Sequence, residues 1–195
     1  MTTAWKRKLV SLLDRSILAA LVIAAAALGA ALTVRPARSA EIVPSIGMTR
    51  SVNGSDQTKT SYGLALRQNI APMLTAEIGG SYRKEDLYNG TTRETQWPVT
   101  ASLWLRPVSA LYAGGGVGWY HTTLSYPQAP ALAGSTTEKF GVHLGGGIEL
   151  PLVPAVASLD LNGRYIYLGN QASQLPPQQF KANYWTTSLG VALHF

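Results

Sequence analysis

The stretch 189-LGVALHF-195 closes the sequence and alternates apolar side chains with small or polar ones. Successive side chains of a strand point to opposite faces, so Leu189, Val191, Leu193 and Phe195 would share one face. Terminal residues are usually frayed unless the fold holds them. The pattern therefore predicts that these residues form a strand inside a sheet.

The same period of two recurs from Glu41 onward, where no segment keeps a helical period for three turns. Most of the predicted strands have about the ten residues that a tilted strand needs to cross a bilayer. Pro44 and Pro98 fall near predicted strand ends, where the missing N–H does least harm. The eight predicted strands cover residues 42–52, 60–69, 74–84, 97–106, 111–125, 139–152, 156–169 and 183–195.

The predicted connections alternate in length. Three are short, namely IAPM (70–73), PVSA (107–110) and VPA (153–155). Four are longer and polar, namely NGSDQTK (53–59), EDLYNGTTRETQ (85–96), YPQAPALAGSTTE (126–138) and NQASQLPPQQFKA (170–182). An even number of strands with short periplasmic turns and longer outer loops is typical of a transmembrane β-barrel.

Residues 1–39 are predicted to be a signal peptide. The basic segment WKRKLVSLLDR (5–15) precedes an apolar run from Ile17 to Leu32, and Ala37 and Ser39 then offer the small residues that a signal peptidase accepts. A retained membrane anchor is the alternative. Cleavage would leave ten basic and nine acidic residues. The high isoelectric point thus reflects targeting, and we predict no nucleic-acid binding.

Alternation alone fits a soluble barrel as well as a membrane barrel. The signal peptide and the low charged fraction of 13% favour the membrane. Aromatic residues near the strand ends would form an interfacial girdle: Tyr62, Tyr82, Trp97, Trp119, Tyr165, Tyr167 and Trp185. We therefore predict an all-β fold, an eight-stranded antiparallel up-and-down transmembrane β-barrel over residues 40–195.

Several segments carry a resemblance to a known family: LYAGGGVGWY (111–120), FGVHLGGGIELPL (140–152), LDLNGRYIYL (159–168) and LGVALHF (189–195). They resemble the small outer-membrane β-barrel proteins of the outer-membrane protein A and X type, the porin-like β-barrel-domain family. The resemblance implies that the terminal strand, with Leu189, Val191, Leu193 and Phe195, is the signal read by the outer-membrane assembly machinery. Members differ in function, so no mechanism follows.

Charged residues on the predicted inward faces gather near the periplasmic end of the barrel. The interior of an eight-stranded barrel is just wide enough for side chains, so these charges should pair. The pairs could form a plug that specifies barrel closure, or a gate that opens a small ion path. The predicted network contains Arg67, Glu77, Arg106, Glu149, Asp160 and, about one layer higher, Arg164, with His194 in the same lower region.

Two glycine triplets, residues 114–116 and 145–147, fall on adjacent predicted strands. Glycine within a strand often marks a bend or the close approach of another group. We expect these glycines to allow curvature and to leave room for Tyr112, Tyr120 or an arginine from across the lumen. A cavity for a small ligand is the alternative.

The sequence offers little for catalysis. Some small barrels modify the acyl chains of lipid A, and His121, Thr123 and Glu138 resemble the layout of the deacylase type. A threonine stands where that type carries serine, so we predict that the protein is not an enzyme. The absence of cysteine excludes disulfides, thiolate metal sites and lipoprotein acylation, and no metal or cofactor site is predicted.

Together these features predict a monomeric integral protein of a Gram-negative-type outer membrane, exported through the periplasm. Its expected role is structural or interactive, with the surface loops contacting envelope components. Expected partners are outer-membrane lipid, lipopolysaccharide and the assembly machinery. The alternatives are a narrow porin-like channel for small solutes or ions and the lipid A-modifying enzyme.

Overall fold

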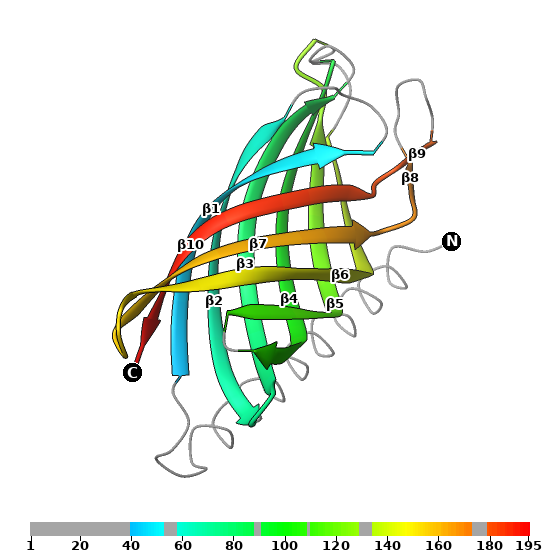
Figure 1. Ribbon diagram of the computed structural model, residues 1–195. Helices are drawn as coiled ribbons and strands as arrows, with labels where there is room; N and C mark the ends of the chain where they lie inside the picture. Colours follow the sequence, from blue (N-terminus) through cyan, green and yellow to red (C-terminus); the bar gives the residue numbers. More distant parts are fainter. Residues whose placement is uncertain (1–39, 53–57, 88–90, 109, 129–133, 173–178) are drawn as a thin grey trace, which may run out of the picture. The chain divides into compact units, whose positions relative to one another are not determined.

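The computed structural model describes residues 40–52, 58–87, 91–108, 110–128, 134–172 and 179–195 (Figure 1). The chain divides into two units, Met1–Arg38 and Ser39–Phe195. The predicted signal peptide lies outside the described residues, and the second unit holds the strands described below.

Eight long strands close into an antiparallel barrel (Figure 1). Around the barrel they follow the order β1, β10, β7, β6, β5, β4, β3, β2, so each strand pairs with its neighbours in the chain and the last pairs with the first. The predicted eight-stranded up-and-down barrel is confirmed. The barrel strands are β1 (Ala40–Ser51), β2 (Lys59–Ala71), β3 (Leu74–Leu87), β4 (Thr92–Val108), β5 (Leu111–Ser125), β6 (Ser135–Val153), β7 (Ala157–Tyr167) and β10 (Tyr184–His194).

The two ends of the second unit meet where the barrel closes. Strand β10 pairs with β1 in a register that places Leu189 opposite Ile46. Ala40 and Phe195 donate a backbone N–H to each other's carbonyl oxygen, both at 3.0 Å. The terminal stretch is therefore held in the sheet, as its alternation predicts.

Three strands continue into segments predicted as loops. Strand β3 reaches Leu87, β4 already begins at Thr92, and β6 begins at Ser135. The prediction of a loop over residues 85–96 was wrong for most of that segment. The antiparallel pairing of β3 with β4 continues there and places Glu85 opposite Glu94. Polar residues can occupy a strand once it extends beyond the hydrocarbon core, so apolar alternation marks only the part of the strand that faces lipid.

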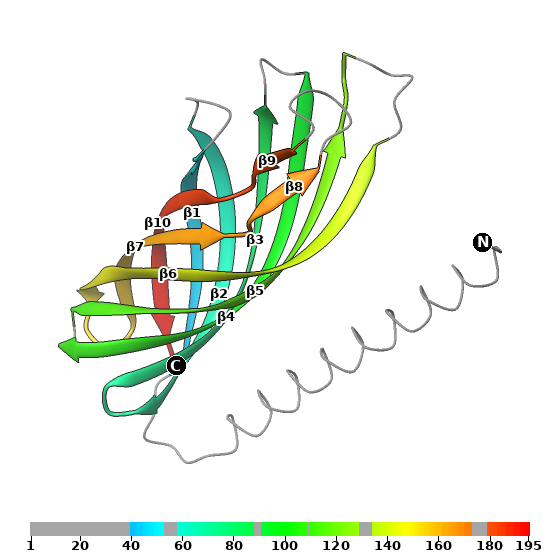
Figure 2. The ribbon, with the colours of Figure 1, turned by 90° about the vertical axis from the view of Figure 1, so that its right-hand side faces the viewer.

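The last predicted loop contains a small hairpin that the sequence did not indicate. Strands β8 (Asn170–Ala172) and β9 (Gln179–Lys181) follow β7 and precede β10 in the chain, and they form a separate two-stranded sheet (Figure 2). Three residues are too few to carry a recognisable period of two.

Pro44 of β1 and Pro98 of β4 both lie inside their strands, and each interrupts the pairing of its strand with one of the two neighbours. Since β4 begins early, Pro98 is not near a strand end as expected, and the register between β3 and β4 passes from Gly80 opposite Val99 to Arg83 opposite Gln96. On its other side Pro98 still pairs with Tyr120 of β5. A missing N–H therefore weakens one seam of the barrel and leaves the other intact.

The two faces of the wall have the polarity of a membrane barrel. Phe140 and Leu144 on the outer face are 84% and 71% exposed, whereas Arg67, Glu77 and Asp160 on the inner face are at most 2% exposed. A soluble barrel would bury the apolar set, so the inverted arrangement indicates a lipid-facing outer surface. Among the residues that the structure describes, no helix is long and apolar enough to cross a membrane.

Aromatic side chains ring the outer face toward the end away from Ala40 and Phe195. The ring centroids of Tyr82 and Trp97 lie 4.6 Å apart, and those of Tyr165 and Trp185 lie 4.7 Å apart. Tyr62 is opposite Tyr82, and Trp119 is opposite Phe140. This is the arrangement of an interfacial girdle.

Candidate functional site

The centre of the lumen holds a buried arginine between two carboxylates. Arg67 on β2 donates from Nε to Glu77 Oε2 of β3 at 2.7 Å and from Nη1 to Asp160 Oδ2 of β7 at 2.7 Å. The hydroxyl of Tyr112 donates to the same Asp160 oxygen at 2.8 Å. Since β2 and β7 are not neighbours in the barrel, the bond from Arg67 to Asp160 crosses the lumen.

A second arginine, Arg106 of β4, connects its own strand to β6 and β1. Arg106 of β4 donates to Glu149 Oε2 of β6 at 2.6 Å and lies 3.5 Å from Glu41 Oε2 of β1. A distance of 4.0 Å between Arg67 Nη1 and Glu149 Oε2 links this group to the first. His194 lies 3.7 Å from both Glu41 and Glu149.

Arg164 of β7 forms the upper edge of the network. Its Nη2 lies 2.9 Å from Glu77 Oε1, and its Nε donates to Asn162 Oδ1 at 2.6 Å. Its guanidinium also covers the Trp104 ring, 4.9 Å from the centroid. The structure thus brings all six predicted network residues into one connected set, which we call the lower network. It comprises Arg67, Glu77, Arg106, Glu149, Asp160 and Arg164, together with Glu41, which the sequence interpretation missed, and Tyr112, which it placed in the lumen but not in the network.

The omission of Glu41 from the predicted network has an identifiable reason. Near its start, strand β1 carries the adjacent apolar residues Ile42 and Val43, one on each face, so the alternation there does not define the inward face. With Glu41 included, four carboxylates face three arginines in the lower network. His194 lies beside the two carboxylates of Glu41 and Glu149.

Glycines make room for the large side chains of the lumen. A Cβ at Gly147 would collide with the hydroxyl of Tyr112, and one at Gly145 would lie 3.0 Å from Arg164 Cγ. A Cβ at Gly118 would lie 2.7 Å from the Tyr120 ring. The triplet 145–147 therefore leaves room for Tyr112 and for Arg164, which comes from the neighbouring strand β7 and not from across the lumen, whereas a Cβ at Gly114 or Gly116 would meet the backbone of β4.

A second charged layer lies farther toward the aromatic girdle. Arg83 of β3 pairs with Glu94 of β4 and donates from Nε to Gln96 Oε1 at 3.0 Å. Its guanidinium lies 3.9 Å from the centroid of the Tyr184 ring. The sequence interpretation missed this layer, because Glu94 and Gln96 fell in a predicted loop, although their alternation with outward-facing residues could have signalled a longer strand.

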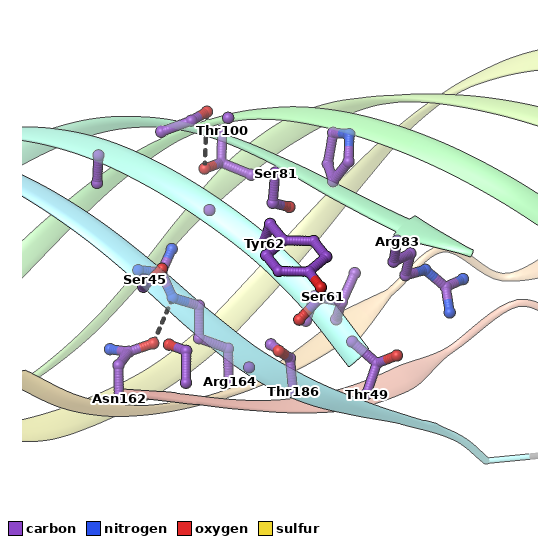
Figure 3. Close-up of a pocket in the computed structure, with 18 of the residues that line it drawn as sticks. Ser45, Thr49, Ser61, Tyr62, Ser81, Arg83, Thr100, Asn162, Arg164 and Thr186 are labelled. Atoms are coloured by element: carbon purple, nitrogen blue, oxygen red, sulfur yellow. Dashed lines mark hydrogen bonds between the residues drawn. The ribbon is translucent and has the colours of Figure 1, made fainter. Parts of the chain in front are cut away.

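A cavity of about 100 Å³ lies between the two charged layers (Figure 3). On one side its wall includes many glycines and small hydroxyl residues from β10, β1, β2, β3 and β4, among them Ser45, Ser61 and Thr100. The larger side chains of Tyr120, His143, Arg164 and Ile166 come from β5, β6 and β7, and that of Tyr184 comes from the start of β10. The asymmetry between the two walls leaves space that an eight-stranded barrel usually fills.

The residues considered for acyl chemistry lie on the outer face. His121 Nδ1 is 3.5 Å from Glu138 Oε1, as the pairing of β5 with β6 requires. The Thr123 hydroxyl instead shares a hydrogen bond of 3.2 Å with Thr136. Residues two apart on one strand face are separated by about 7 Å, so this geometry does not join His121 to the threonine hydroxyl.

A closed eight-stranded barrel with an apolar outer face, an aromatic girdle and a charged lumen defines an integral β-barrel of the outer membrane type. The family model for the outer membrane protein beta-barrel domain matches residues 16–195. The chain belongs to this family. No sequence relative was found among the curated proteins.

Solved structures share the fold at low sequence identity. Neisserial surface protein A matches with a TM-score of 0.61 and 16% identity, over 81% of this chain and 97% of that one. OprG from Pseudomonas aeruginosa matches with a TM-score of 0.55 and 16% identity, over 81% and 95%. Ail of Yersinia pestis, solved with the heparin analogue sucrose octasulfate, matches with a TM-score of 0.50 and 14% identity, over 81% and 98%. At these identities the likeness establishes the fold alone.

Proposed function

We propose that the protein is a closed, non-enzymatic barrel of the outer membrane that acts through the outer ends of its strands and their loops. The observation that carries this proposal is the lower network, in which buried ion pairs connect β1, β2, β3, β4, β6 and β7 across the lumen. Opening a path would separate charges that have little access to water, and unpaired buried charges are strongly unfavourable. The network thus favours a plug over a gate.

The outer ends of β3 and β4 support contact with charged envelope components. Beyond the aromatic girdle, Lys84 is exposed, and Arg93 donates from Nε to Asp86 at 2.7 Å. This hydrogen bond lowers the pKa of the Asp86 carboxyl below its ordinary value. We propose lipopolysaccharide and outer-membrane lipid as partners, with the aromatic girdle at the interface and these polar ends above it.

We further propose that the chain is exported through the periplasm after removal of residues 1–39 and that the barrel is a monomer. Its terminal strand would then be the signal for the assembly machinery. The four signal residues lie on the outer face, and Phe195 is 66% exposed although its backbone is paired with Ala40. A side chain that contributes little to internal packing is free to be recognised before insertion.

The Phe195→Ala variant should therefore separate assembly from stability. We expect the yield of the barrel in the outer membrane to fall several-fold, while the urea midpoint of the purified, refolded variant stays close to that of the wild type. Heat-modifiable gel mobility measures both the folded fraction and the midpoint. The signal role would be rejected if the variant reached the outer membrane at the wild-type level.

Single-channel recording tests the closed lumen. The refolded wild-type barrel in a planar bilayer should give no reproducible conductance steps under conditions in which a large porin conducts. An alternative function as a narrow channel is favoured by the cavity in the upper lumen. Reproducible steps that change in the Arg106→Gln variant would establish that alternative and place the gate in the lower network.

A further inference from the structure

Two residues that line the cavity between the two charged layers each carry a buried polar group without a hydrogen-bond partner. Tyr120 and His143 both line it and are 1% and 2% exposed. Among the residues that the structure describes, neither the Tyr120 hydroxyl nor His143 Nδ1 has a hydrogen-bond partner. The other ring nitrogen of His143, Nε2, shares a hydrogen bond of 2.9 Å with the Ser102 hydroxyl, so only Nδ1 is without a partner. Buried polar groups in folded proteins are nearly always hydrogen-bonded, which points to a molecule that completes them.

We propose that this cavity is a binding site for a small uncharged polyol, which hydrogen-bonds to the Tyr120 hydroxyl and to His143 Nδ1. The site goes beyond the proposed function, since a barrel closed at the lower network can still hold a solute above it. The experiment below therefore does not depend on the bilayer recording.

The charges around the cavity argue for an uncharged molecule. Both arginines that line it already have acidic partners, because Arg164 pairs with Glu77 at 2.9 Å and Arg83 pairs with Glu94. An added anion or cation would have to be desolvated without a counter-charge of its own, which is unfavourable in a buried site.

The lining residues and the size of the cavity favour a small molecule that carries several hydroxyl groups. The opposite wall presents the hydroxyls of Ser45, Ser61 and Thr100, each of which can donate or accept a hydrogen bond. The tyrosine rings of the large-residue wall offer apolar faces to the C–H groups of a polyol. About 100 Å³ is several times the room that one water needs and far below that of a drug-sized pocket.

Glycerol is the probe that these properties select. Protein purified from membranes would be placed in nanodiscs, with labelled histidine and tyrosine side chains observed by NMR during a glycerol titration. We expect a saturable shift of the His143 Nδ1 resonance and intermolecular contacts between glycerol protons and the Tyr120 ring. Lactate, a charged molecule of similar size, should produce no saturable shift.

The Tyr120→Phe variant removes one hydrogen bond and keeps the ring. We expect its glycerol affinity to fall at least tenfold, whereas Tyr165→Phe, the same change on the outer face, should bind as the wild type does. Heat-modifiable mobility establishes that both variants are folded. The proposal is overturned if the resonance responds without saturation, if Tyr120→Phe binds equally well, or if only ordered water contacts the two groups.

Discussion

Replacing Arg67 with methionine should lower the free energy of unfolding by about 3–5 kcal/mol, the loss expected when one partner of a buried ion pair is removed. Arg67 is the one residue that touches both Glu77 and Asp160 within the described part of the lumen, at 2.7 Å each. Without it these two carboxylates would face each other in a space with little access to water. Glu77 would keep Arg164, whereas Asp160 would keep only neutral hydrogen-bond donors such as Tyr112.

Urea unfolding in lipid vesicles, followed by heat-modifiable mobility, measures this loss. Two controls separate charge from packing. The double variant Arg67→Met, Asp160→Asn should recover most of the lost stability, because Glu77 keeps Arg164 and no buried carboxylate is then left without a cation. Arg93→Gln breaks a pair whose side chains are 39% and 40% exposed, so it should change stability by less than about 1 kcal/mol. Equal stability of Arg67→Met and the wild type would show that the lower network does not hold the barrel.

The barrel itself could be predicted from the sequence because lipid-facing positions must be apolar at every second residue. On β6 and β7 this constraint is strong, and there the predicted inward residues Glu149, Asp160 and Arg164 all lie in the lower network. A one-residue slip would have moved all of them to the outer face, so a clear alternation fixes the register of the whole strand.

The parts that sequence analysis missed lie where that constraint is weak. Glu41 stands at the start of β1, whose two faces differ little in polarity there. Glu94 and Gln96 stand on an extension of β4 beyond the girdle, where outward residues such as Arg93 can be polar. The cavity depends on which wall carries the small residues. That information is spread over five strands and appears only when their registers are known.

Replacing Gly116 with alanine should destabilise the barrel by about 3 kcal/mol or prevent its closure, at the upper end of the effects of overpacking. Gly116 lies on β5 opposite Ser102 of β4 and His143 of β6. A Cβ there would collide with the carbonyl oxygen of Ala101 and lie 2.7 Å from Ser102 Cα. Both are backbone atoms of a hydrogen-bonded neighbour, so they cannot move aside without opening the seam between β4 and β5.

Gly163 of β7 provides the matched control for this change. A Cβ at Gly163 would meet no heavy atom within 4 Å, so Gly163→Ala should keep the wild-type urea midpoint. The pair of variants isolates the local collision, since each replaces one strand glycine by the same residue. If both variants unfolded at the same urea concentration, the glycines of β5 would serve curvature or chain flexibility. If Gly116→Ala alone is destabilised, close approach of the β4 backbone is the reason that position 116 must be glycine.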